Sequence, residues 1–157
     1  MGTGAYGYSE SVTVIDGESE TRLEGERGEP ARGAPPLELS LRAESESVAL
    51  ARHAVADFAR GHGCDPEDVA LAVSEAVSNA VIHAFRGREP GTIDVRAIAD
   101  GDKLVVSISD DGVGVTPNPD SPGLGLGLAL IGSLSEGIEL RRDGHGTTLI
   151  MRFPRAG

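Results

Sequence analysis

The stretch from Ser109 to Gly132 reads SDDGVGVTPNPDSPGLGLGLALIG, and it decides how the rest of the chain is interpreted. Glycines and prolines crowd its first part, and an apolar run of helical character begins at about Leu124. Glycine loses more backbone entropy on folding than any other residue, so ordering this loop is costly. The loop is therefore either without fixed structure or bare of side chains because a ligand must approach its backbone.

Composition restricts the class of protein. The 157 residues predict one domain, and a hydrophobic content of 39% with only 3% aromatics predicts a core of Leu, Val, Ile and Ala. The net charge of -11 and the scattered arginines argue against nucleic-acid binding, because phosphate backbones would be repelled. The single cysteine, Cys64, excludes an internal disulfide and fits a reducing, cytoplasmic compartment. No apolar run approaches about 20 residues, so we expect no membrane span.

Residues 1–35 differ from the remainder of the chain. They are polar, charged and rich in Gly and Pro, so they bury too little apolar surface to offset the entropy of ordering. We expect a disordered acidic N-terminal arm, in which SVTVI (residues 11–15) is a stray strand or a docking segment. The folded domain is expected to cover residues 36–157.

Periodicity within residues 36–157 predicts strand, helix, helix, strand, strand, helix, strand and strand. The first strand is LELSLRA (37–43), the helices cover about 44–61, 66–85 and 124–134, and the hairpins turn at Gly101 and within RDGHG (142–146). Asp65 and Pro66 are typical of a capped helix start. Adjacent hairpins imply antiparallel pairing, so we expect an α+β fold: a two-layer sandwich with a mixed, mostly antiparallel sheet and helices on one face.

The second helix carries a carboxylate and a carboxamide one turn apart. Glu75 and Asn79 lie four residues apart, which places them on one stripe, whereas Leu71, Val73, Val77, Ala80 and Val81 are expected to form an apolar face. An amide oxygen suits Mg²⁺ with phosphates, and a carboxylate can orient or deprotonate a nucleophile. The alternative is a polar face exposed to solvent.

Three further signals follow along the chain. Asp110 ends a strand and is followed by Gly112, so it can accept a hydrogen bond from an exocyclic amine such as that of adenine; the alternative is an ordinary turn. Gly123, Gly125 and Gly127 precede a helix, where backbone N–H groups favour an anion such as triphosphate, although no P-loop lysine is present. Thr147 starts the last strand and could contact Asp110 and a base, unless it reflects only β-propensity.

The order of these four signals is more informative than any one of them. Together they resemble the GHKL, or Bergerat-fold, ATP-binding superfamily, and within it the small bacterial anti-sigma factor serine/threonine-protein kinases. VSEAVSNAVIHAF resembles the N box of that superfamily, ISDDGVG its G1 box, GLGLGLALI its G2 box and GTTLIMRF its terminal strand. The resemblance covers about Leu37 to Phe153.

The resemblance implies a role for each matching position. Asn79 would be the Mg²⁺ ligand, Glu75 the general base or the residue that orients the attacking hydroxyl, and Asp110 the partner of the adenine amine. Thr147 would support that contact. The remaining ATP-binding positions would be glycines, of which two shape the adenine site and three lie along the phosphates: Gly112, Gly114, Gly123, Gly125 and Gly127.

The resemblance also implies partners. The relatives bind a sigma factor and phosphorylate a serine of a small anti-anti-sigma protein, and they are expected to form homodimers. Arg52 on the first helix is our candidate for a partner contact, because a cation on an acidic protein can anchor an acidic surface; a helix arginine that only packs its stem is the alternative. The other function left open is a nucleotide-dependent module that sequesters its partner without phosphorylating it.

Overall fold

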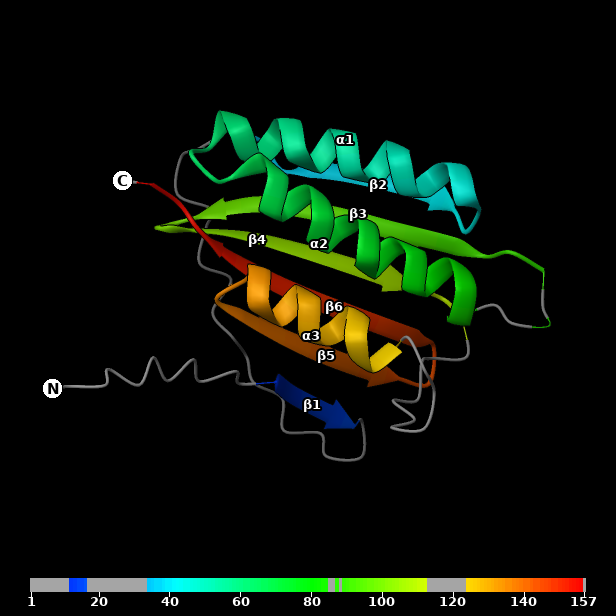
Figure 1. Cartoon of the computed structure of the whole chain (residues 1–157). Coiled ribbons are helices and arrows are strands. Elements are labelled where there is room, and N and C mark those ends of the chain that lie inside the picture. The colour runs from blue at the N-terminus through cyan, green and yellow to red at the C-terminus, as the bar shows by residue number, and fades with distance from the viewer. Residues whose placement is uncertain (1–11, 17–33, 85–86, 88, 113–123, 157) are drawn as a thin grey trace, which may run out of the picture.

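The computed structural model describes residues 12–16, 34–84, 87, 89–112 and 124–156. A six-stranded sheet carries three helices on one face (Figure 1). The elements in chain order are β1 (Val12–Asp16), β2 (Leu37–Arg42), α1 (Ser45–Gly61), α2 (Pro66–Asn79), the π-helix η1 (Ala80–Ala84), β3 (Thr92–Asp100), β4 (Lys103–Asp110), α3 (Leu124–Leu134), β5 (Gly137–Asp143) and β6 (Gly146–Pro154).

The strands run in the spatial order β1-β5-β6-β4-β3-β2. Strands β5, β6, β4, β3 and β2 pair antiparallel with their neighbours in this order, and β1 pairs in parallel with β5 at the edge of the sheet. The predicted α+β sandwich with a mixed, mostly antiparallel sheet is therefore confirmed. For residues 12–16 the structure gives the strand alternative, while most of the N-terminal arm lies outside the described residues, and the boundary at residue 36 stays a prediction.

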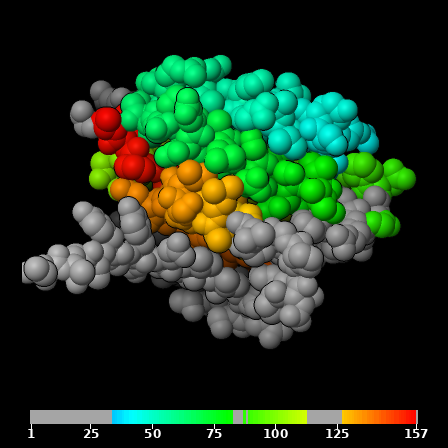
Figure 2. Space-filling model, in the orientation of Figure 1, coloured from blue at the N-terminus to red at the C-terminus, as the bar shows by residue number. Residues whose placement is uncertain are grey.

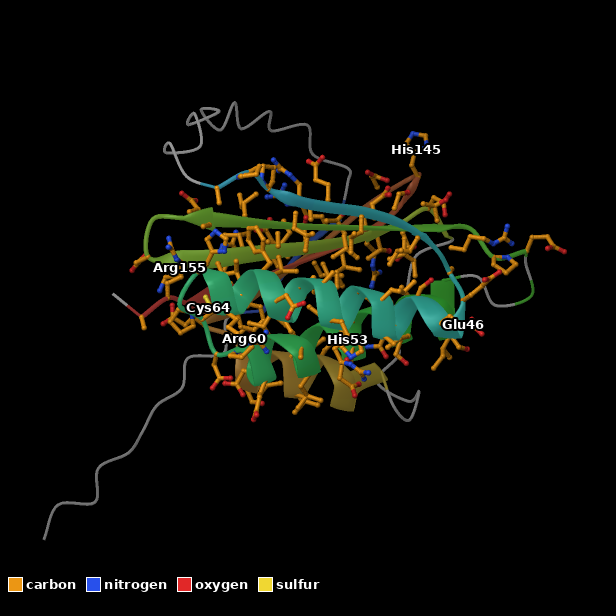
Figure 3. The ribbon with its side chains drawn as sticks, turned by 90° about the horizontal axis from the view of Figure 1, so that it is seen from above. Glu46, His53, Arg60, Cys64, His145 and Arg155 are labelled. Atoms are coloured by element: carbon orange, nitrogen blue, oxygen red, sulfur yellow. The ribbon has the colours of Figure 1, made fainter. Side chains whose placement is uncertain are left out.

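The core lies between the sheet and the helices. Side chains alternate along β4 and β6, so that Leu104, Val106 and Ile108 from β4 and Met151 and Phe153 from β6 are buried toward the helical layer. Apart from Phe153, Met151 and Cys64, the buried hydrophobic side chains are Leu, Val, Ile and Ala, as the composition predicts. In the view from above, the ribbons of the helices lie on one side of the strands, with Glu46, His53 and Arg60 spaced along α1 (Figure 3).

Helix α2 begins as predicted and ends differently. The Asp65 carboxylate accepts hydrogen bonds from the backbone N–H groups of Glu67 at 2.9 Å and Asp68 at 3.4 Å, and Pro66 opens the helix. The α-helix ends at Asn79, and η1 replaces its expected continuation to residue 85. The predicted apolar face was wrong at Leu71, which is 44% exposed, because the buried stripe follows the 3–4 spacing of Val69, Ala72, Val73, Ala76 and Val77.

Chain direction brings four candidate segments to one end of the molecule. Figure 1 shows the C-terminal end of α2, the end of β4, the start of α3 and the β5–β6 turn at this same end. Figure 2 shows α1, α2 and α3 side by side across the helical face. The residues singled out from four separate motifs therefore belong to one region of the fold.

Candidate functional site

The first part of the site is the contact between α2 and α3. Glu75 and Asn79 are half-buried, and both lie against Gly127 of α3. A Cβ atom at residue 127 would meet Asn79 Nδ2 at 2.9 Å, Glu75 Oε2 at 3.4 Å and Asn79 Oδ1 at 3.5 Å. The carboxylate and the carboxamide thus face the glycine-bearing helix. The solvent-exposed polar face that was the alternative is not what the structure contains.

We predict that Gly127→Ala damages the site without unfolding the protein. Alanine favours a helix over glycine by about 1 kcal/mol, but the new methyl group must displace the Asn79 amide. Nucleotide affinity should fall by about tenfold or more, the equivalent of one lost hydrogen bond. Calorimetry with ATP measures this. Gly132→Ala on the same helix is the matched control, since its Cβ would meet nothing within 4 Å and its affinity should be unchanged.

The second part of the site lies on the sheet at the ends of β4 and β6. Asp110 pairs in register with Thr147, and the alternation of each strand turns both side chains toward the helical layer. Thr147 is 6% exposed, and its Oγ1 has no hydrogen-bond partner within the described part of the chain. Buried hydroxyl groups are normally satisfied, so an orphaned one beside a carboxylate marks a place for a ligand or water.

The carboxylate of Asp110 is held by its own turn. Its Oδ1 accepts a hydrogen bond from the Gly112 backbone N–H at 3.1 Å, and Asp111 Oδ1 accepts one from the Thr92 backbone N–H at 3.0 Å. Burial raises the pKa of Asp110 above its ordinary value; the Gly112 N–H opposes this shift, and the nearby Asp111 charge adds to it. A desolvated acceptor at a fixed position suits the recognition of an amine.

We predict that Asp110→Asn stabilises the empty protein while weakening nucleotide binding. Because the pKa is higher in the folded than in the unfolded state, this group's contribution to stability is present at low pH and lost as pH rises through the folded pKa. Asparagine carries no charge, so the variant does not pay the cost of holding an ionised carboxylate in this half-buried position at pH 7. Its thermal unfolding at pH 7 should therefore occur at a higher temperature than that of wild type. This difference in unfolding temperature should vanish as pH falls toward 3.8, where the wild-type carboxyl is also neutral in the folded protein. A variant less stable than wild type at pH 7 would contradict the assignment.

The structure describes only some of the other predicted positions. Gly112 opens the loop and donates to Asp110, whereas Gly114 and Gly123 lie outside the described residues. Gly125 is placed by its backbone within α3. Arg52 lies half-buried on α1, and nothing in the described part of the chain tests its role, which stays a prediction.

Sequence reasoning gave no role to Gly146. Its φ of +152° and the 1.8 Å between a Cβ built there and the Asp110 carbonyl oxygen require glycine. The G-T pair before the last strand was the available signal, but only the strand register shows what this glycine touches.

Fold and site together define a class of protein: a two-layer α+β domain in which a carboxylate–amide pair on one helix faces a glycine-bearing helix above an acidic strand end. The model of the histidine kinase-like ATPase domain matches residues 41–153, so the chain belongs to this family. The resemblance to the GHKL superfamily is thereby confirmed.

Curated relatives match over most of their length. The anti-sigma F factor of Clostridium acetobutylicum is 32% identical over 133 residues, covering 74% of this chain and 91% of the relative. The serine-protein kinase RsbW of Listeria monocytogenes is 33% identical, covering 73% and 84% respectively.

A solved structure is also similar. The crystal structure of the RsbU and RsbW domains of Rv1364c from Mycobacterium tuberculosis matches with a TM-score of 0.62 and 26% identity over 78% of this chain. This chain spans 33% of that longer one. Within the described residues, no helix combines the length and apolar character needed to cross a membrane.

Proposed function

We propose that this protein is an ATP-dependent serine/threonine-protein kinase that binds a sigma factor and phosphorylates an anti-anti-sigma partner. The observation that carries the proposal is the Glu75–Asn79 pair facing Gly127 across the α2–α3 contact. Family membership supports ATP as the nucleotide, and the names of the anti-sigma F factor and RsbW relatives support the switch function.

The residues present fit ATP. Asp110 supplies a half-buried acceptor for the adenine amine, and the Thr147 hydroxyl, which has no hydrogen-bond partner among the described residues, lies opposite it. At the helical layer, Gly127 leaves open the space that a Cβ atom would fill beside Asn79. One set of donors and acceptors thus lies at the strand ends, where it would hold the base, and another lies between α2 and α3, where it would hold the phosphates.

The residues also fit Mg²⁺ held together with phosphates. Across the described ranges, no group of three or more His, Cys, Asp or Glu side chains could hold a metal ion alone. Mg²⁺ typically takes one or two protein oxygens plus phosphate oxygens and water, which the Asn79 amide oxygen suits. When bound, the ion would neutralise charge on the transferring phosphoryl group.

Glu75 is the residue that acts on the substrate hydroxyl. It lies one turn before Asn79 and faces the same glycine, so it is close to the expected phosphate end of the nucleotide. A serine hydroxyl donates its proton to a carboxylate in this position, which orients the oxygen for attack. Phosphoryl transfer depends mainly on positioning and charge stabilisation, and such a base contributes typically 10²–10⁴-fold.

The helical layer is our candidate for the partner surface. Within the described part of the chain, three large hydrophobic side chains are exposed, and all lie in helical elements: Leu50, Leu71 and Ile82 at 58%, 44% and 53%. Exposed apolar side chains in the same helical layer as a half-buried cation, Arg52, suit a protein partner that is apolar and carries some acidic groups.

We predict that Asn79→Ala abolishes magnesium-dependent ATP binding. The substitution removes the only side-chain oxygen assigned to the ion while leaving the helix intact, since alanine is the best helix former. Calorimetry with and without Mg²⁺ measures the effect, and circular dichroism checks the fold. Unchanged magnesium-dependent affinity would remove Asn79 from the site. Ser78→Ala, on the adjacent position of α2, is a control that should bind normally.

A further inference from the structure

The guanidinium group of Arg142 belongs to the strand next to the second part of the site, the part formed by Asp110 and Thr147 at the ends of β4 and β6. The Nε and Nη2 atoms of Arg142 are buried, and like Thr147 Oγ1 they have no hydrogen-bond partner within the described residues. A buried polar group without a partner is costly, and a buried charge without a partner is more so. Two such groups on neighbouring strands indicate that something else completes them.

Strand register places these groups in one row with Asp110. Asp110 of β4 pairs with Thr147 of β6, and Thr147 pairs with Arg142 of β5. Ile138 and Leu140 are buried toward the helical layer, and Arg142 continues their alternation. Since neighbouring strands lie about 4.8 Å apart, the row spans about 10 Å at the strand level, a distance comparable to the size of a purine base and one polar group on each side of it.

We propose that Arg142 recognises the base of the bound nucleotide by a hydrogen bond to one of its ring nitrogens. The row presents an acceptor, Asp110, at one end and donors, Thr147 and Arg142, toward the other. Adenine has the complementary pattern, because its exocyclic amine donates and the ring nitrogens beside it, N1 and N7, accept. The guanidinium donates to one of these nitrogens while Asp110 accepts from the amine. Guanine is disfavoured, since its O6 would face the Asp110 carboxylate.

The base is favoured over the phosphates as the group that Arg142 binds. The phosphates are assigned to Asn79 and Gly127, which lie in the helical layer, whereas Arg142 shares the sheet-level row with the residues assigned to adenine. This inference rests on the proposed nucleotide-binding function and adds the residue that determines base specificity.

Arg142→Met tests the proposal, because methionine keeps an unbranched stem and removes every donor. Affinities of wild type and variant for ATP and for adenosine are measured by calorimetry. We expect both ligands to bind the variant about tenfold or more weakly, by the same factor. Arg141→Met is the matched control. Arg141 is exposed, alternates to the opposite face and pairs with Glu139, so its loss should leave both affinities unchanged.

Base analogues identify the ring nitrogen. If Arg142 donates to N1, 1-deaza-ATP should bind wild type as weakly as ATP binds Arg142→Met; if it donates to N7, 7-deaza-ATP should do so. The analogue that lacks the contacted nitrogen should bind Arg142→Met and wild type with the same affinity. Thermal unfolding adds an independent readout. Removing a half-buried guanidinium, two of whose nitrogens have no partner among the described residues, should leave the empty variant as stable as wild type or more stable, whereas a purely structural arginine would give a less stable protein.

Each outcome decides the proposal. Weaker binding of ATP but unchanged binding of adenosine would overturn it, because the contact would then be with phosphate. Unchanged affinity for both ligands, while wild type binds ATP, would also overturn it and leave the proposed function intact. If wild type itself binds no ATP, the proposed function fails and the role of Arg142 fails with it.

Discussion

Glu75→Gln should bind Mg²⁺–ATP with wild-type affinity and transfer phosphate about 10²–10⁴-fold more slowly. Glutamine keeps the shape of the side chain against Gly127, so the α2–α3 contact is retained. It lacks the negative charge that accepts a proton from the serine hydroxyl. Single-turnover transfer of labelled phosphate to the anti-anti-sigma protein measures the rate, and calorimetry measures the affinity.

The matched control is Glu67→Gln, at an exposed position in the first turn of the same helix. It changes the net charge equally and should transfer at the wild-type rate. If Glu75→Gln transferred at full rate, the general base would lie elsewhere and the nucleotide site would remain. If it lost binding as well, Glu75 would be a ligand-holding residue.

Gly146→Ala should have the largest effect on stability. A Cβ atom at this position would lie 1.8 Å from the carbonyl oxygen of Asp110 and 3.1 Å from the Cα of Asp111, so the backbone itself must move. We expect a loss of about 3 kcal/mol or more in the free energy of unfolding, because the left-handed φ adds strain to the clash. For a chain of this size, that corresponds to a fall in Tm of about 10 °C.

Gly144→Ala separates this effect from general sensitivity of the β5–β6 turn. The methyl group there would meet nothing within 4 Å, so its Tm should change little. A Gly146→Ala protein with wild-type Tm would show that β6 can shift away from β4 at this point. The register between Asp110 and Thr147, on which the site depends, would then be less fixed than described.

The sequence predicts those features that depend on local spacing. The interval between Glu75 and Asn79 puts them on one stripe, and Asp65-Pro66 marks the helix start that the structure contains. The hairpin at Gly101, with its φ of +57°, follows from the turn signal between two alternating runs. The order of these elements is sufficient for the α+β class and the mostly antiparallel sheet.

Features that depend on how elements pack together are beyond such reasoning. That Gly127 contacts Glu75 and Asn79 follows from the approach of α3 to α2, which no local pattern encodes. The row of Asp110, Thr147 and Arg142 requires the register of three strands that are separate in sequence. Leu71 was misplaced because its apolar character alone does not show on which side of α2 it lies.

The most direct measurement is calorimetry of Mg²⁺–ATP binding, followed in the same sample by labelled phosphate transfer to a candidate anti-anti-sigma protein. The predicted result is binding together with transfer to a serine. Asn79→Ala should abolish the magnesium-dependent binding, and Glu75→Gln should bind normally but slow the transfer. Binding without transfer to any such protein would contradict the kinase assignment and favour a nucleotide-dependent sequestering module. Absence of ATP binding by the wild-type chain would contradict the proposed function as a whole.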